Sequence, residues 1–259
     1  MVNDCENNEI ANLDFSSKGD MLLVMIAGKS ILKVYFTKDN WKSARLLHSI
    51  DIEEYIHPVG TYPIAKFVQN DSFIAIGTTG GHLFCLNYEK YNKEHILKIS
   101  DLKAHSFAIS NMTKFEDQKV SYLITGSIDC SAKLWDMSRL QYKGSFNRMN
   151  LSGVASAFFA MDGKYILSNA GDNNILIWNV ESGKCVDSIS DLPTCPYRMA
   201  YHDENGQLAV SLIDGRVILY NFNYESLKFS YLRTVEMRDR QILQLEYSVN
   251  GEKLLAVDY

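Results

Sequence analysis

Short apolar stretches alternate with polar residues along much of the chain, and turn-forming residues separate them. Residues 122 to 136 read YLITGSIDCSAKLWD: an apolar run leads into small residues, and a second alternating run follows a turn at Asp129. Apolar runs of this length, bounded by turn residues, are typical of buried β-strands. The stretch predicts a β-hairpin with Asp129 at its tip and Trp135 near the end of its second strand.

The same hairpin pattern recurs along the chain. YILSNAGDNNILIWN at 165–179 again places an aspartate six residues before a tryptophan, QLAVSLIDGRVILYN at 207–221 keeps Asp214, and weaker copies lie at 21–36 and 72–87. The position that Trp135 occupies, which we call the aromatic slot, is separated from copy to copy by 50, 50, 43 and 42 residues. Its occupants are Tyr35, Cys85, Trp135, Trp178 and Tyr220. This regular spacing indicates a structural repeat.

Each repeat also has an alternating segment before the hairpin and another after the aromatic slot. Examples of the first are 11–15, 154–159 and 197–201, and an example of the second is 184–189. Four short strands in units of about 43 residues are typical of β-propeller blades. The sequence therefore predicts an all-β fold with about five four-stranded blades, half of a sixth, and almost no helix.

The repeat spacing also gives the expected domain organisation. In the sixth unit the strands are expected near 242–247 and 254–259, and the next aromatic slot would fall past the last residue. This pattern favours a single propeller domain over 10–259 that is a piece of a larger, seven-bladed propeller. The expected parts are a polar tail at 1–9 and blades at about 10–55, 62–103, 105–148, 150–191, 195–235 and, incomplete, 240–259.

These repeats resemble the tryptophan-aspartate (WD) repeat family, from about residue 10 to the end. In that family a histidine before the first strand, a Ser or Thr in the second, the turn aspartate and the third-strand tryptophan form a hydrogen-bonded tetrad. A carboxylate only accepts hydrogen bonds, an indole N–H only donates, and a hydroxyl and a neutral imidazole do both, which suits such a chain. The resemblance implies a full tetrad at His105, Thr125, Asp129 and Trp135, and a partial one at Ser168, Asp172 and Trp178.

Composition and charge limit the classes of protein to which this chain could belong. The chain has 259 residues, 46% hydrophobic and 22% charged, as in ordinary globular proteins. Its net charge is −5 and no segment is rich in Lys or Arg, so a strong signal for nucleic-acid binding is missing. The longest apolar stretch, 21–28, is too short for a bilayer span of about 20 residues. We expect no membrane insertion.

The expected location is intracellular, either cytoplasmic or nuclear. The amino-terminal residues MVNDCENNE are polar and acidic, unlike a secretory signal. Five cysteines without a CxxC pair suit a reducing compartment and argue against a zinc site.

The chain contains two candidate clusters for catalysis or metal binding. His202-Asp203-Glu204 has the residue types of an acid/base or metal site, but its position is that of an exposed turn, which favours a structural role. His105 and Asp129, with Ser127 nearby, could form a catalytic group, but the tetrad explains their spacing. No phosphate loop or nucleophile elbow occurs. We expect no catalytic residues, no metal, no cofactor and no small-molecule substrate.

The resemblance implies a rigid, non-enzymatic platform that binds other proteins on its face and rim. The expected function is a scaffold or adaptor subunit of a multiprotein complex. Alternatives are the substrate-recognition subunit of a ubiquitin ligase, a component of a coat, pore or RNA-processing assembly, or an enzyme with a site at the channel mouth. Fold alone does not choose between these functions.

Candidate partner-binding residues are those expected just before the turn residue in three of the hairpins: Thr78, Ile128 and Ile213. Large apolar side chains are unusual at a solvated turn. They either anchor a partner or cap the cores of the blades, and the sequence leaves both interpretations open.

Overall fold

The computed structural model describes ten segments of the chain: residues 9–27, 30–38, 41–53, 63–88, 96–98, 104–146, 156–170, 172–223, 225–237 and 241–258. Within these segments the regular elements are β-strands, and no α-helix occurs. Accordingly, the described part of the chain has no helix long and apolar enough to cross a membrane. The expected polar tail lies outside the described residues, apart from residue 9.

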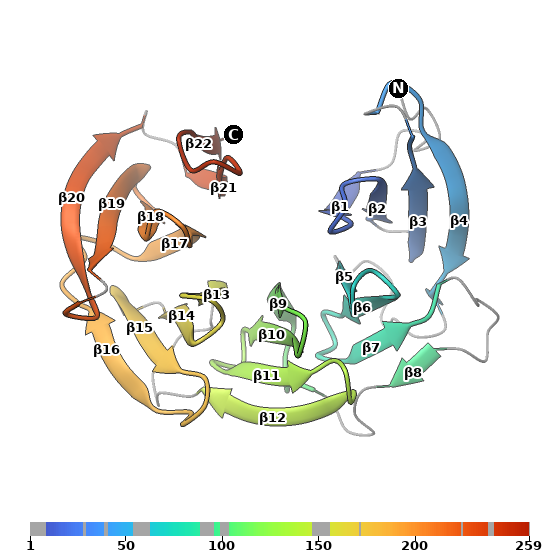
Figure 1. Ribbon diagram of the computed structural model, residues 1–259, viewed down its shortest axis with the longest axis horizontal. Helices are drawn as coiled ribbons and strands as arrows, with labels where there is room; N and C mark the ends of the chain where they lie inside the picture. Colours follow the sequence, from blue (N-terminus) through green and yellow to red (C-terminus); the bar gives the residue numbers. More distant parts are fainter. Residues whose placement is uncertain are drawn as a thin grey trace. The chain divides into compact units, whose positions relative to one another are not determined.

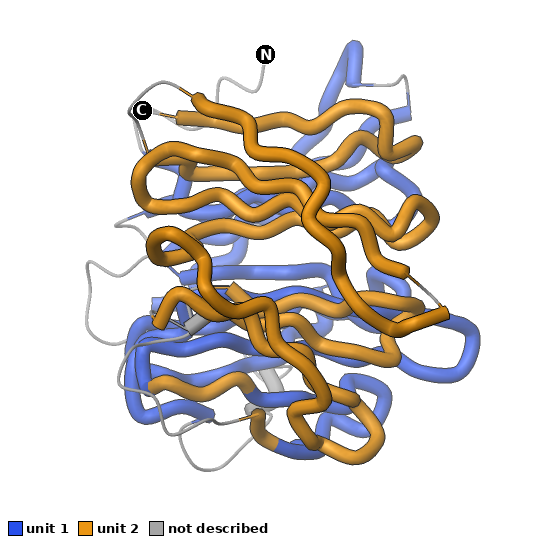
Figure 2. The backbone as a smooth tube through the Cα atoms, turned by 90° about the vertical axis from the view of Figure 1, so that its left-hand side faces the viewer, with its two compact units in different colours: residues 1–129, 133–144 blue, residues 130–132, 145–259 orange. Residues whose placement is uncertain are grey.

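The strands form five four-stranded sheets and one two-stranded sheet, and within each sheet the neighbours follow the order of the sequence (Figure 1). This confirms the expected five four-stranded blades and the two strands of a sixth. We number the four-stranded sheets blades 1 to 5. The chain divides into two compact units, residues 1–129 with 133–144, and residues 130–132 with 145–259 (Figure 2).

Unit 1 contains blades 1, 2 and 3, except for residues 130–132 and 145–146 at the ends of two blade 3 strands. Its strands are β1 (Ile10–Phe15), β2 (Met21–Ile26), β3 (Ile31–Phe36) and β4 (Arg45–Asp51) in blade 1; β5 (Ile64–Val68), β6 (Phe73–Gly77), β7 (Leu83–Leu86) and β8 (Ile96–Lys98) in blade 2; and β9 (Ile109–Glu116), β10 (Ser121–Ser127), β11 (Ala132–Asp136) and β12 (Gln141–Phe146) in blade 3.

Unit 2 contains blades 4 and 5 and the two-stranded sheet. Its strands are β13 (Ser156–Ala160), β14 (Tyr165–Ala170), β15 (Asn174–Asn179) and β16 (Cys185–Ile189) in blade 4; β17 (Pro196–His202), β18 (Gln207–Leu212), β19 (Arg216–Asn223) and β20 (Lys228–Glu236) in blade 5; and β21 (Ile242–Tyr247) and β22 (Leu254–Asp258) in the two-stranded sheet.

The second strand of a blade is buried on both faces, which explains its nearly continuous apolar sequence. Successive side chains of a strand point to opposite faces. In blade 2, Ile74 and Ile76 join a core cluster with Leu23 of blade 1, whereas Ala75, between them, joins a cluster with Trp135 of blade 3. Unit 2 repeats this arrangement in β18, whose side chains alternate between clusters shared with blade 4 and with β21.

All five aromatic-slot residues lie on the third strand of their blades and are buried, with at most 9% of the residue exposed. In blades 1, 4 and 5 the slot residue pairs with an apolar residue of the second strand, as Tyr35 does with Leu22 and Trp178 with Ile166. The slot therefore marks a core position. A cysteine can occupy it in blade 2 because burial is the property that the position requires.

Candidate functional site

The four tetrad residues of blade 3 come from four different parts of the blade and meet in its interior. His105 precedes β9, Thr125 lies in β10, Asp129 is in the following turn and Trp135 is in β11. His105 Nδ1 lies 3.0 Å from Asp129 Oδ2, and His105 Nε2 lies 2.7 Å from Thr125 Oγ1. Trp135 Nε1 donates to the same hydroxyl at 2.9 Å. The structure thus brings all four side chains into one chain of hydrogen bonds.

The chemistry of the two ends sets the direction of this chain. The Asp129 carboxylate only accepts, so the Nδ1 that faces it carries the imidazole proton. Burial lowers the pKa of His105 below its usual value of 6.5, although the neighbouring Asp129 carboxylate acts to raise it. The neutral ring then accepts at Nε2 from the Thr125 hydroxyl, which in turn accepts from the indole of Trp135. Each buried polar group of the tetrad therefore has a hydrogen-bond partner.

The loop that carries His105 is held by blade 2. The Gly81 carbonyl accepts a hydrogen bond from the His105 N–H at 2.8 Å. Gly81 has φ of +81°, and a Cβ added there would lie 2.1 Å from the His105 carbonyl oxygen. Only glycine fits this close approach without a shift of the backbone. Gly81 therefore fixes the backbone of the neighbouring blade's histidine from a hairpin turn.

Blade 4 contains the partial tetrad in a shorter form. Trp178 Nε1 donates to Ser168 Oγ at 2.9 Å, and both side chains are buried. Asp172 lies in the next turn, where its carbonyl accepts from the side chain of Asn174 at 2.9 Å. Ser168 and Trp178 are therefore brought together as a pair.

A buried asparagine beside this pair was missed by sequence reasoning. Asn169 Oδ1 accepts from the Ser156 N–H at 2.6 Å, and its Nδ2 donates to the Pro196 carbonyl at 2.9 Å. This side chain joins blade 4 to the start of blade 5. An asparagine inside an apolar second strand was the signal that could have found it.

The turn aspartate of blade 5 has a different partner. Asp214 Oδ2 accepts from Arg216 Nε at 2.8 Å and from Arg216 Nη2 at 2.5 Å. These hydrogen bonds hold the pKa of Asp214 below its usual range. The turn aspartate of blade 5 is therefore paired with a nearby arginine, whereas that of blade 3 is paired with a histidine.

The candidate partner-binding residues differ in exposure. Ile128 and Ile213 are 58% and 49% exposed, so neither caps a blade core. Their backbone N–H groups bond to equivalent carbonyls before the first strand of their own blades, those of Ala108 and Cys195. Each isoleucine therefore has a fixed backbone and a side chain in solvent.

Thr78 differs from the expectation, because it is buried, with 1% exposed. It follows Gly77 as Ser127 follows Gly126, and Ser127 is also buried. The stretch from this glycine to the aromatic slot is one residue shorter in blade 2 than in blade 3. Thr78 therefore corresponds to Ser127 and not to Ile128, and its hydroxyl accepts from the His82 N–H inside the turn at 3.0 Å.

Phe107 is an exposed apolar residue that the sequence patterns did not single out. It is 63% exposed and lies two residues after the tetrad histidine. Its carbonyl accepts from Ser127 Oγ at 3.2 Å, and the next carbonyl, that of Ala108, accepts from the Ile128 N–H at 3.2 Å. Segments 107–108 and 127–128 thus lie side by side. We call Phe107 and Ile128 the blade 3 apolar pair.

His202 and Asp203 are less exposed than a solvated turn implies. Asp203 is half-buried, and its Oδ1 accepts from the Asp162 N–H of blade 4 at 3.3 Å. Burial raises the pKa of Asp203 above its usual 3.8. His202 Nε2 lies 2.9 Å from the Val249 carbonyl in the turn between β21 and β22. These two side chains join neighbouring sheets within unit 2.

The candidate nucleophile Ser127 and the aromatic-slot residue Cys85 both lie in buried environments. In the described segments no three His, Cys, Asp or Glu side chains are grouped so that they could hold a metal ion. Ser127 Oγ, the candidate nucleophile, is buried and donates to a backbone carbonyl. Burial raises the pKa of the Cys85 thiol to about 12, which keeps it protonated and unreactive.

Comparisons with known proteins agree with this geometry. Residues 97–136, which span the tetrad of blade 3, match the family model "WD domain, G-beta repeat". Nuclear distribution protein PAC1 of Candida tropicalis is 28% identical over 112 residues, which are 43% of this chain and 22% of that protein. WD repeat-containing protein SL1-17 of Schistosoma mansoni is 25% identical over 136 residues, 52% of this chain and 44% of that protein.

A solved structure supports the fold in a second way. A chain of the crystal structure of a mitotic checkpoint complex matches with a TM-score of 0.77, over 97% of this chain and 72% of that chain, at 16% identity. The sheets and this match define an all-β protein with the fold of a β-propeller. The match to the WD-repeat model covers residues 97–136, and one of the relatives above is itself named a WD repeat-containing protein, in agreement with the resemblance. The matched part of the chain spans less than half the length of the two curated relatives above.

Proposed function

We propose that the protein is a non-enzymatic scaffold or adaptor subunit of an intracellular multiprotein complex, and that its partners are other proteins. The observation that carries the proposal is the blade 3 apolar pair, two large exposed side chains at the end of the blade that also holds the complete tetrad. Binding of proteins is also the typical use of the WD-repeat fold, which is an argument from the family and not from the site.

The apolar pair has the properties of an interaction anchor. Protein interfaces gain most of their affinity from a few central apolar or aromatic residues. Anchors bind best when little conformational freedom is lost on binding. Here the Ser127 hydroxyl and the Ile128 N–H donate to the carbonyls of Phe107 and Ala108, and Asp129 Oδ2 accepts from the Ser106 N–H at 2.9 Å. These bonds, one of them to the tetrad residue Asp129, hold the backbone of Phe107 and Ile128 in place before a partner arrives.

Ile213 is a second candidate anchor, on blade 5 in unit 2. It has the same backbone contact as Ile128 and a similar exposure. The adjacent Asp214 and Arg216 form an exposed ion pair beside this anchor, whereas Asp129 beside Ile128 is bonded to His105. Thr78 is buried and is not proposed as a contact.

The test is affinity purification of the tagged protein, with mass spectrometry of the recovered partners, for wild type and for Ile128→Asp with Ile213→Asp. A partner recovered with wild type should be lost with the double variant, whose melting temperature should stay close to wild type because both side chains are exposed. Val249→Asp is the matched control, since Val249 is an apolar turn residue that is 98% exposed. It should retain the partner.

The single variants show which of the two units binds the partner. Loss of the partner with Ile128→Asp alone assigns binding to blade 3, and loss with Ile213→Asp alone assigns it to blade 5. Full recovery of every partner by a well-folded double variant would contradict the proposed anchors.

A further inference from the structure

The first turn of blade 2, between β5 and β6, has an unusual backbone. Gln69, Asn70 and Asp71 have φ values of 54°, 51° and 64°, so three consecutive non-glycine residues are left-handed. Residues other than glycine, asparagine and aspartate seldom adopt this region, and several left-handed residues in a row are rarer still. A strained backbone persists only where surrounding contacts hold it, and it is a reason to look for a role.

Blade 4 has the same turn with a different third residue. Met161, Asp162 and Gly163 have φ values of 55°, 52° and 70°, and the Lys164 N–H donates to the Met161 carbonyl at 3.1 Å. In blade 2 the matching bond runs from Ser72 to Gln69 at 3.2 Å. Glycine is thus the relaxed choice at the third position. Blade 2 has Asp71 there, and its side chain must supply something that glycine does not.

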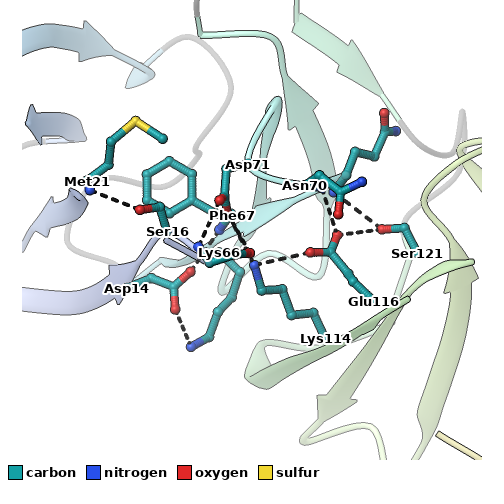
Figure 3. A network of polar contacts seen from close by, with 12 residues as sticks. Asp14, Ser16, Met21, Lys66, Phe67, Asn70, Asp71, Lys114, Glu116 and Ser121 are labelled. Carbon is teal, nitrogen blue, oxygen red and sulfur yellow. Dashed lines mark hydrogen bonds and ion pairs between the residues drawn. The ribbon is translucent and has the colours of Figure 1, made fainter. Parts of the chain in front are cut away.

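The Asp71 carboxylate binds both neighbouring blades. It is 8% exposed. Towards blade 1, Oδ2 accepts from the Ser17 N–H at 2.8 Å and Oδ1 from Ser17 Oγ at 3.1 Å. Towards blade 3, Lys114 Nζ lies 3.5 Å from Oδ1, and Figure 3 shows Asp71 and Lys114 reaching towards each other. A single carboxylate therefore contacts blade 1 on one side and blade 3 on the other.

The rest of the turn is held by blade 3. The Asn70 N–H donates to Glu116 Oε1 at 3.3 Å (Figure 3). The Gln69 N–H donates to Ser121 Oγ at 3.3 Å. Ser121 Oγ in turn donates to Glu116 Oε1 at 2.7 Å. Lys114 Nζ lies 3.4 Å from Glu116 Oε2. Lys114 is therefore the cation between the two carboxylates that position this turn.

We propose that the turn Gln69–Asp71 is a strained latch that couples the first turn of blade 1 to β9 of blade 3, with Lys114 as the group that keeps it closed. Without the ammonium group, Asp71 and Glu116 become two neighbouring carboxylates without their shared cation, and the left-handed backbone loses part of what holds it. The turn then relaxes, and the Ser17 N–H loses its acceptor. A change in blade 3 is thereby transmitted to blade 1.

The test is amide hydrogen exchange of the intact protein, measured by mass spectrometry on peptides that cover Ser17 and Gln69–Asp71. Lys114→Met should speed exchange at both places by about fivefold to tenfold, because the charge-assisted bonds from the Ser17 and Asn70 N–H groups to the two carboxylates are weakened. Lys114→Arg keeps the charge and should stay within about twofold of wild type. Lys119→Met, which removes an exposed lysine of the same blade, should change neither peptide.

Two Asp71 variants separate the latch from general damage. Asp71→Gly relieves the backbone strain but removes the carboxylate, so exchange at Ser17 should rise while the melting temperature changes little. Asp71→Asn keeps an oxygen for the Ser17 N–H and loses the attraction to Lys114, so it should give an intermediate rate. If Lys114→Met does not fold, Asp71→Asn gives the comparison, because it removes the attraction to Lys114 and keeps an oxygen for the Ser17 N–H.

The decisive peptide is the one in blade 1. Unchanged exchange at Ser17 in Lys114→Met, or in both Asp71 variants, would overturn the proposal. Faster exchange confined to Gln69–Asp71 would show a local turn and not a coupling, and would overturn it equally.

Discussion

Thr125→Val tests the tetrad of blade 3 most directly. Valine has nearly the shape of threonine, so the substitution removes the hydroxyl without opening a large cavity. The hydroxyl accepts from Trp135 and lies against Nε2 of His105, and none of these three residues is more than 2% exposed. The variant therefore leaves two buried polar groups without their partner.

The size of the effect follows from this count. A buried donor or acceptor left unsatisfied costs about 1 to 3 kcal/mol, so two such groups give about 2 to 6 kcal/mol, and we expect about 3 kcal/mol after local relaxation. Ser168→Ala in blade 4 leaves one group, the indole N–H of Trp178, without its partner. It should cost about half as much. Thr234→Val removes an exposed hydroxyl and should stay within about 0.5 kcal/mol of wild type.

The assay is equilibrium unfolding in urea, with the free energy obtained from the midpoint and the slope. A double-mutant cycle with Trp135→Phe adds a second measurement, because removing the indole N–H first should reduce the effect of Thr125→Val by about 1 kcal/mol or more. Equal midpoints for wild type and Thr125→Val would refute the reasoning. A larger effect for Ser168→Ala than for Thr125→Val would also refute it.

Three further predictions concern titration and backbone fit. Burial lowers the pKa of His105 below 6.5, so the unfolded chain takes up the proton first and stability should fall as the pH drops below about 6.5. His105→Gln should reduce this dependence of stability on pH, measured by urea unfolding between about pH 7 and 5. Burial raises the pKa of Asp203, so the contribution of this residue to stability falls as the pH rises through its folded pKa. Asp203→Asn should therefore raise the unfolding midpoint at neutral pH and lose this advantage below about pH 4. A lower midpoint at neutral pH would contradict the argument. Gly81→Ala should lower stability by about 2 kcal/mol or more, against about 1 kcal/mol for Gly183→Ala, which also has positive φ but nothing within 4 Å of the added Cβ; equal thermal shifts would contradict it.

The strands could be predicted from the sequence because their cause is local. Alternation along a strand and burial on two faces produce the apolar runs, and the repeat spacing places Trp135 and Trp178 on equivalent third strands. The tetrad positions follow from the same spacing once the family resemblance supplies their roles. The structure adds the distances that join them.

The missed features depend on contacts between segments far apart in the sequence. Thr78 was misplaced because one hairpin turn is a residue shorter than its counterpart, and local patterns did not show which residue the difference removes. Asp71 meets Ser17 across 54 positions and Lys114 across 43, so its role could not be read from its neighbours in the chain. The residue types of the His202-Asp203-Glu204 cluster drew attention to Asp203, but its burial depends on contact with Asp162 of blade 4.

The placement of the tryptophans has a consequence for spectroscopy. The chain has three: Trp41 in the connection between β3 and β4, where its indole donates to the Gly19 carbonyl, and the buried Trp135 and Trp178 on blades 3 and 4. Two of these natural fluorophores belong to unit 1 and one to unit 2. Variants that keep one tryptophan at a time would report the emission of a single blade without any added dye. Because repeat proteins gain stability from each unit and its neighbours, such emission curves would show whether blades 1, 3 and 4 melt together or in sequence.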